Sequence, residues 1–221
     1  MPYGTVLRWR RGLTVGPPPE EPPWRPPDAY SYAYLLGLYL GDGHVTARPR
    51  GRSLLRVFLD GVYPGIVADC QMAIRLTTMG GSSSIQFQGD SRVNVVQSGW
   101  KRWPEAFPQH GPGRKHERPI VLADWQEAIV DAHAGPFVRG LIHSDGCRTV
   151  NRFKTKLPSG RVAEYAYPRY FFSNLSPDIR RLFCEACDRL GVKWTLSNPR
   201  NVSVSHRHGV AILEELVGPK A

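Results

Sequence analysis

The segment that decides the fold is "LLGLYLGDGHV" at residues 35–45, and a related segment, "VRGLIHSDGCR", follows about a hundred residues later at 138–148. Each is an apolar stretch that runs directly into an aspartate and a glycine. Glycine is preferred just past the end of a helix, where the chain often turns into the left-handed conformation. The pattern therefore predicts two helices that end at Asp42 and Asp145, with Gly43 and Gly146 left-handed.

Small residues recur at the same spacing in both segments, as Gly37 and Gly41 in the first and as Gly140 and Ser144 in the second. Small side chains allow two helix backbones to approach closely. We therefore expect the two helices to pack around a pseudo-twofold axis, which would bring the two aspartates together.

Two converging carboxylates at the negative ends of two helix dipoles would form a strongly negative spot. A divalent cation relieves that repulsion, and hard oxygen ligands fit Mg²⁺ or Ca²⁺ better than zinc. Beside DNA phosphates, such a metal is suited to the hydrolysis of phosphodiester bonds. A single Asp-Gly is more often a simple turn, so the prediction depends on the matched pair.

Composition indicates a globular protein with an anionic partner. The 221 residues are 41% hydrophobic, and 29 Lys and Arg outnumber 19 Asp and Glu, which gives a net charge of +10. This excess favours nucleic acid over a membrane surface. With no apolar run long enough to cross a bilayer and no signal peptide, we expect a cytoplasmic protein.

Four scattered cysteines are too few for a disulfide scaffold. Cys184 and Cys187 form a CxxC without a second pair at zinc-ligand spacing. We interpret them as small buried side chains on a helix.

Changes in composition divide the chain into three parts. A basic head, "TVLRWRRG" at residues 5–12, is read as an unstructured arm, with the last turns of a recognition helix as the alternative. The stretch "PPPEEPPWRPP" at 17–27 predicts a stiff polyproline-II spacer, and 109–119 predicts a linker with a boundary near Gly113. The predicted parts are the head and spacer at 1–29, a first half at 30–112 and a second half at 113–221.

The halves repeat one order of elements, which predicts an α+β fold of two pseudo-symmetric αββαββα units with antiparallel, saddle-shaped sheets. In the first half a basic loop follows Gly43, then come strands at 54–61, 83–89 and 91–99 and a helix at 63–78. In the second half strands are expected at 149–156, 163–173, 193–197 and 202–205, and helices at 176–191 and 209–218. Pro64 and Pro177 occupy matching helix starts.

Period-2 alternation predicts that each sheet has an apolar face toward helices and an open polar face. Ile85, Phe87, Val93, Val95 and Phe153 are assigned to the apolar face. A solvated face needs no partner, but amide, hydroxyl and basic side chains suit base edges and phosphates. The residues predicted to contact DNA are Arg48, Arg52, Gln86, Gln88, Arg92, Asn94, Arg152, Lys154, Lys156, Lys193, Thr195, Ser203 and Arg207.

From about residue 30 to 218, the chain resembles the single-chain LAGLIDADG homing endonucleases, whose two signature helices match "LLGLYLGDG" and "VRGLIHSDG". The resemblance implies a divalent-metal-dependent DNA endonuclease with Mg²⁺, or another cation such as Mn²⁺ or Ca²⁺. Asp42 and Asp145 would bind the metals, together with the carbonyl groups of Gly41 and Ser144.

The chain departs from the family pattern beside these acids. The sixth motif position, often acidic in the family, is Leu40 in one segment and His143 in the other, and Arg139 replaces a small residue. We interpret His143 as an interface or surface residue and not as a catalytic base.

Family members also place polar side chains around the metals, at positions that no motif fixes. Aligning the two halves makes Gln97 and His206 equivalent, with Lys101 and Arg207 nearby. We predict Gln97, Lys101 and His206 as further catalytic residues, which could polarise the scissile phosphate or only contact the DNA backbone.

The leading hypothesis is a free-standing monomeric endonuclease, not an intein, that cuts a non-palindromic site in double-stranded DNA. The main alternative is a regulator that binds DNA without cleaving it, as do bacterial sporulation-type transcription regulators that resemble these nucleases. A third is an RNA-splicing maturase on the same scaffold.

Overall fold

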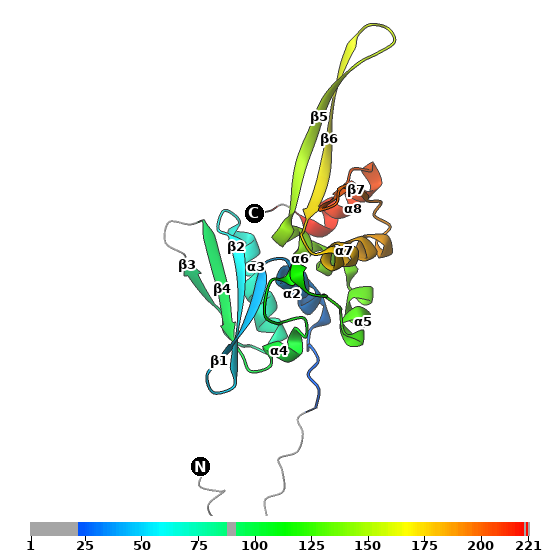
Figure 1. Cartoon of the computed structure of the whole chain (residues 1–221). Coiled ribbons are helices and arrows are strands. Elements are labelled where there is room, and N and C mark those ends of the chain that lie inside the picture. Colours follow the sequence, from blue (N-terminus) through cyan, green and yellow to red (C-terminus); the bar gives the residue numbers. More distant parts are fainter. Residues whose placement is uncertain (1–21, 88–91, 219, 221) are drawn as a thin grey trace, which may run out of the picture.

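Two central helices end in the repeated Asp-Gly motifs. The computed structural model describes residues 22–87, 92–218 and 220, and in it α2 (Ala29–Asp42) packs against α6 (Ala134–Asp145) in the middle of the molecule (Figure 1). Asp28 begins α2, because its side chain accepts a hydrogen bond from the Ser31 backbone amide at 2.7 Å. Residues 32–40 of α2 are all buried, as expected of a helix that is apolar on every side.

Each half adds a four-stranded antiparallel sheet. The first sheet has the order β1-β2-β4-β3 and the second has the order β5-β6-β8-β7, which confirms an α+β fold of two pseudo-equivalent repeats. The strands are β1 (Gly43–Arg48), β2 (Arg52–Asp60), β3 (Ser84–Phe87), β4 (Val93–Gly99), β5 (Gly146–Lys156), β6 (Val162–Ser173), β7 (Thr195–Asn198) and β8 (Asn201–Val204).

The remaining helices cover the sheets and join the halves. Pro64 and Pro177 begin the equivalent helices α3 (Pro64–Thr77) and α7 (Pro177–Arg189), as their positions predict. The others are α4 (Trp103–Ala106), α5 (Asp124–Ala132), α8 (Arg207–Val217) and the 3₁₀ turn η1 (Lys115–Glu117). None of the described helices is long and apolar enough to cross a membrane.

The predicted basic loop after Gly43 is wrong, because this segment forms strand β1. It pairs with β2 from Gly43 opposite Val57 to Arg48 opposite Arg52. Val45 is the only large apolar side chain in β1, so this edge strand lacks the alternation by which strands are recognised.

The two glycines that follow the motif aspartates are extended and not left-handed, which corrects the prediction. Gly43 has φ −89° and Gly146 has φ −108°. A Cβ at Gly43 would lie 2.5 Å from the Tyr39 Cα, and one at Gly146 would lie 2.7 Å from the Ile142 Cα. Glycine is required here because the strand leaves by crossing closely over its own helix.

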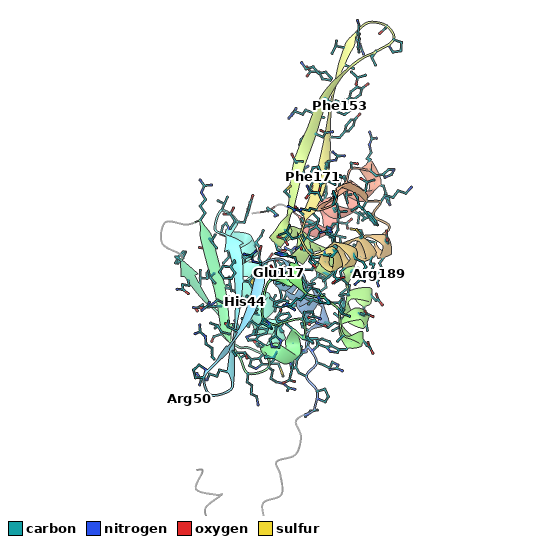
Figure 2. All side chains as sticks on the ribbon, viewed as in Figure 1. His44, Arg50, Glu117, Phe153, Phe171 and Arg189 are labelled. Carbon is teal, nitrogen blue, oxygen red and sulfur yellow. The ribbon has the colours of Figure 1, made fainter. Side chains whose placement is uncertain are left out.

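The hairpin of β5 and β6 is much longer than that of β1 and β2 and extends beyond the helices (Figure 1). Every residue of β5 except Gly146 is exposed. Phe153 stacks on Tyr165, and Tyr165 stacks on Tyr167, with ring centroids 5.4 and 5.9 Å apart. Figure 2 shows Phe153 on the protruding part of the hairpin and Phe171 near its base.

Part of the segment predicted as a spacer packs onto the body. Trp24 is 7% exposed and contacts Tyr32, Trp100 and Trp125 edge to face. The Arg102 guanidinium donates to the Pro22 carbonyl oxygen at 2.8 Å. The basic head at 5–12 lies outside the described residues.

The CxxC cysteines belong to the hydrophobic core. Cys184 and Cys187 are both buried in α7 and carry free thiols. Burial raises the pKa of the Cys184 thiol to about 11, which keeps it protonated and a poor metal ligand. Their interpretation as small buried helix residues is confirmed.

Candidate active site and nucleic-acid interface

Backbone contact between α2 and α6 brings the two motif aspartates to one place. A Cβ at Gly37 would lie 2.5 Å from the Phe137 carbonyl oxygen, and one at Gly140 would lie 2.2 Å from that of Tyr34. At the end of the contact, a Cβ at Gly41 would lie 3.0 Å from Asp145 Oδ2. The predicted close packing through small residues is confirmed, and the Asp145 carboxyl lies against the end of α2.

Both aspartates are held in surroundings that disfavour their charge. Burial, followed by repulsion from Asp145, raises the pKa of Asp42 to about 7. Burial also raises the pKa of Asp145, although a hydrogen bond from Asn174 to its carboxyl opposes the effect. Asn174 Nδ2 donates to Asp145 Oδ2 at 2.6 Å. Perturbed carboxyls that face one another are typical of functional sites.

Lys115, which sequence reasoning missed, closes the C-terminus of α2. Its Nζ donates to the backbone carbonyls of Tyr39, Leu40 and Gly41, the last two at 2.9 Å. The Leu40 and Gly41 carbonyls belong to the last turn, where helix carbonyls lack partners within the helix, whereas the Tyr39 carbonyl also accepts from the Gly43 amide. The ammonium is buried, which lowers the pKa of Lys115 to about 8 although Asp42 and Asp145 both raise it.

Lys220 plays the corresponding part at the end of α6. Its Nζ donates to the carbonyl oxygens of His143 and Gly146, at 3.3 and 2.5 Å. It also lowers the pKa of both motif aspartates. Each helix end therefore meets one lysine from outside the repeated core, in a linker or near the C-terminus, where no motif marks it.

The oxygen atoms at this place fit a hard divalent cation. Asp42, Asp145 and the Gly41 carbonyl supply the kind of ligands that Mg²⁺ and Ca²⁺ prefer, and Lys115 demonstrates that the Gly41 oxygen accepts a cation. Gly41, Lys115, Asp145 and Asn174 line a cavity of about 330 Å³. No cluster of three or more His, Cys, Asp or Glu side chains suited to a metal occurs among the described residues, so carbonyls would have to contribute.

Open-face side chains beside the two aspartates differ sharply between the halves. In the row next to Gly43, strand pairing places His44, Arg56, Gln97 and Ser84 opposite one another. The corresponding row next to Gly146 holds Cys147, Phe171, Ser203 and Thr195. Polar groups suited to a phosphate therefore gather in the first half, and Arg56 is a member that sequence reasoning missed.

This pairing contradicts the predicted equivalence of Gln97 and His206. Gln97 corresponds to Ser203, and His206 comes three residues later, as the N-cap of α8. Lys101 lies beyond the other end of β4, past the pair of Leu54 and Gly99. The lysines that act on the pKa of Asp42 are Lys115 and Lys220.

Several residues predicted to contact DNA lie on the open faces of the sheets or are exposed beside them. Residues directly opposite in an antiparallel sheet share a face, so Arg48, Arg52, Gln86 and Thr195 are on the open faces. All four are exposed, as are Arg92, Lys193 and Arg207 outside the strands. Ser203 shares the open face but is only 1% exposed. Gln88 lies outside the described residues.

Strand register reverses two of the face assignments. Asn94 pairs with Leu59 on the helix side, whereas Val93 and Val95 belong to the open face. Similarly, Arg152, Lys154 and Lys156 share a side with the buried Tyr170 and Phe172, and Phe153 shares the open face with Phe171. Beyond the helices both faces of the hairpin meet solvent, so the exposed face there need not be the polar one.

His143 is an interface residue, as interpreted. It is 5% exposed, and its Nε2 lies 3.2 Å from the Val217 carbonyl oxygen while its Nδ1 lies 2.9 Å from the Tyr34 hydroxyl. A carbonyl oxygen only accepts, so Nε2 donates and Nδ1 accepts from Tyr34. Burial lowers the pKa of His143 to about 4, which keeps it neutral.

The comparison with known proteins yields structural likeness alone. No family model matches the sequence, and no curated protein matches it. The structure is similar to I-DmoI in complex with DNA and Mn, with a TM-score of 0.53 and 17% identity over 86% of this chain and 98% of that one.

Two further similar structures point to the same fold. The LAGLIDADG meganuclease I-AabMI bound to uncleaved DNA has a TM-score of 0.51 and 10% identity over 86% of this chain and 82% of that one. Full-length DUF199/WhiA from Thermatoga maritima has a TM-score of 0.52 and 15% identity over 86% of this chain and 55% of that one. At these identities the likeness establishes the LAGLIDADG-like fold.

Proposed function

We propose that the chain is a divalent-metal-dependent endonuclease that hydrolyses phosphodiester bonds in double-stranded DNA. The observation that carries the proposal is the meeting of Asp42 and Asp145 at the abutting ends of α2 and α6, where burial raises the pKa of both. In a protein that only binds DNA, two half-buried acids at the centre of the binding surface would oppose binding, because carboxylates repel phosphate.

Each group in the site has a role in this proposal. Asp42 and Asp145, with the carbonyls of Gly41 and Ser144, would hold Mg²⁺, Mn²⁺ or Ca²⁺; when bound, the cation supplies an acidified water and stabilises negative charge. Gln97 and Arg56 share the open-face row beside Gly43, from which they would bind oxygens of the scissile phosphate. Asn174 orients the Asp145 carboxyl through its 2.6 Å hydrogen bond.

The proposed target is a long duplex site without a palindrome. Each half places its sheet on its own side of the helix pair (Figure 1), and strand register gives the two open faces different side chains. Because both central helices belong to one chain, a monomer completes the site.

The test is a cleavage selection on a randomised duplex pool with Mg²⁺, run with the wild-type, Asp42→Asn and Asp145→Asn proteins. We expect metal-dependent cuts from the wild type alone, a loss of at least about 10³-fold in each variant, and binding within a few fold of wild type. Cuts that persist in both variants would remove the two aspartates from the mechanism.

A DNA-binding regulator without cleavage is the second candidate, because two observations favour it. Lys115 already compensates the charge at the end of α2, and the row beside Gly146 offers Cys147, Phe171 and Ser203 instead of basic groups. Enrichment of a bound sequence with no cuts in any variant would support this function.

A further inference from the structure

We propose that Lys115 is a built-in counter-ion which occupies the cation position at the end of α2, so that its ammonium and a divalent cation bind there in alternation. The inference rests on the metal site of the proposed function. It adds that this site is closed by the chain itself until residues near Lys115 withdraw.

The contacts of the ammonium support exclusive occupancy. Nζ lies 2.9 Å from the carbonyl oxygens of both Leu40 and Gly41, and it also donates to Tyr39. The Gly41 carbonyl is one of the ligands expected for the metal. A divalent cation binds such an oxygen at about 2.0 to 2.6 Å, so two cations on one carbonyl would lie within a few ångströms and repel strongly.

The segment around Lys115 is a short turn with exposed neighbours, although Arg118 anchors it through a hydrogen bond to the Gln109 carbonyl. Lys115 lies on the short turn η1, between the two halves. Its neighbours Arg114 and Glu117 are exposed, and the ion pair between them, at 4.0 Å, lies within the turn itself. Lys115 lines cavities of about 330 and 230 Å³, so open space adjoins it.

A competing account makes Lys115 a fixed cation that stays beside the aspartates and contacts the DNA phosphate. The two accounts differ in what metal does to Lys115. A fixed lysine keeps its contacts when metal binds, whereas a counter-ion must release the carbonyls. Binding of metal to the protein without DNA therefore separates them.

The first experiment titrates Mn²⁺ into the full-length wild-type, Lys115→Met and Arg114→Ala proteins and follows free Mn²⁺ by electron paramagnetic resonance. Loss of three charge-assisted hydrogen bonds should make Lys115→Met bind Mn²⁺ about tenfold more tightly or better. Arg114→Ala removes one positive charge from the same turn without touching the carbonyls and should stay within about twofold of wild type. Equal or weaker binding by Lys115→Met, or no binding by any protein, overturns the proposal.

The second readout is brief trypsin treatment with and without Mg²⁺, with peptides counted by mass spectrometry. Cleavage after Lys115 should rise several-fold with Mg²⁺ relative to cleavage after the exposed Arg114, and Asp42→Asn should abolish the increase. If the ratio of cleavage after Lys115 to cleavage after Arg114 does not change with Mg²⁺, in a protein that binds Mn²⁺, then Lys115 and the metal do not take turns at one position. Neither experiment contains DNA. Tighter Mn²⁺ binding by Lys115→Met and release of Lys115 by Mg²⁺ would therefore support the counter-ion proposal even if the wild-type protein cuts no duplex.

Discussion

At the scale of single residues, Asp42 stands out because the last turn of its own helix, which the structure describes in full, has no basic side chain. Burial and the neighbouring Asp145 raise its pKa from the ordinary 3.8 to about 7. The folded protein therefore keeps a proton on Asp42 between about pH 4 and pH 7, where the unfolded chain has lost it. Folding stability from this group is present below about pH 4 and falls as the pH rises to 7.

The Asp42→Asn variant should consequently be more stable than the wild type at pH 8 and nearly equal to it at pH 4. We expect a gain of up to about 4 kcal/mol at pH 8, since the two pKa values differ by about three units and each unit corresponds to about 1.4 kcal/mol. Thermal unfolding in the presence of EDTA at both pH values measures it. Glu127→Gln, an exposed residue of α5, is the control, and a gain independent of pH would contradict the assignment.

At the scale of elements, the contact of α2 with α6 depends on the absence of side chains. A Cβ at Gly37 or Gly140 would meet backbone atoms of the opposite helix at 2.5 and 2.2 Å. Backbone atoms cannot rotate away as the end of a side chain can. The helices would have to separate, and the aspartates at their ends would separate with them.

Gly37→Ala and Gly140→Ala should each destabilise the protein by about 3 kcal/mol or more, the upper part of the range for overpacked cores. Gly99→Ala is the matched control, because a Cβ there meets nothing within 4 Å and its backbone needs no positive φ. Urea unfolding of the three variants gives the comparison. A small effect at Gly37 and Gly140, similar to that at Gly99, would mean that the helices separate without cost.

The long β5–β6 hairpin separates two kinds of DNA-binding side chain onto two faces. Tyr165 and Tyr167 share the open face, while Arg152, Lys154 and Lys156 lie on the side of the helices. We expect Tyr165→Ala with Tyr167→Ala to change which bases are selected at one end of the bound site. Alanine at the three basic positions should leave the selected sequence unchanged and reduce the salt dependence. The slope of log K against log salt should fall by about 0.9 for each phosphate that the variant no longer neutralises.

Selection from a random pool, with binding measured from about 50 to about 300 mM salt, tests both variants of the hairpin. Lys193→Ala, an exposed lysine before β7, serves as the control for removal of charge elsewhere. If the tyrosine variant altered only the salt slope, the open face of the hairpin would not be the face that reads bases.

The sequence was sufficient for the repeated helices and for the other strands, but it missed β1 and the contacts that do not repeat. The motif segments predicted α2, α6 and their close packing, because small residues at helical spacing let two helix backbones approach closely. The alternation in β4 and β5 misled, since Val95 and Phe153 are apolar on an open face. Lys115 and Lys220 reach the aspartates from segments without a periodic pattern, and only the folded chain brings them there.

At the scale of the whole molecule, the strand residues next to the two aspartates differ in polarity, although Asn174 donates a hydrogen bond to Asp145 in the second half. His44, Arg56 and Gln97 adjoin the first, whereas Cys147, Phe171 and Ser203 adjoin the second. In the proposed nuclease the two DNA strands would therefore be cut at unequal rates. The net charge of +10 acts on both strands alike and does not remove the difference.

Supercoiled plasmid carrying the selected site should pass through a nicked form that accumulates to a majority before linear product appears. Gel analysis of a time course with Mg²⁺ measures this, and Gln97→Ala should slow the first cut by at least about tenfold. Linear product that forms without a nicked intermediate would show that the polar row has no effect on the order of cutting.

The glycine contact also constrains how such a protein can change over generations. Each half can alter its strands, its hairpin length and its open face independently, as the unequal hairpins show. Gly37 and Gly140 are different, because any larger residue at one requires a compensating retreat of the other helix. Descendants of this chain are thus free to acquire new recognition surfaces on either half, as long as the contact of Gly37 with Gly140 is kept. A half taken from another protein could replace either half only if its helix made the same close contact.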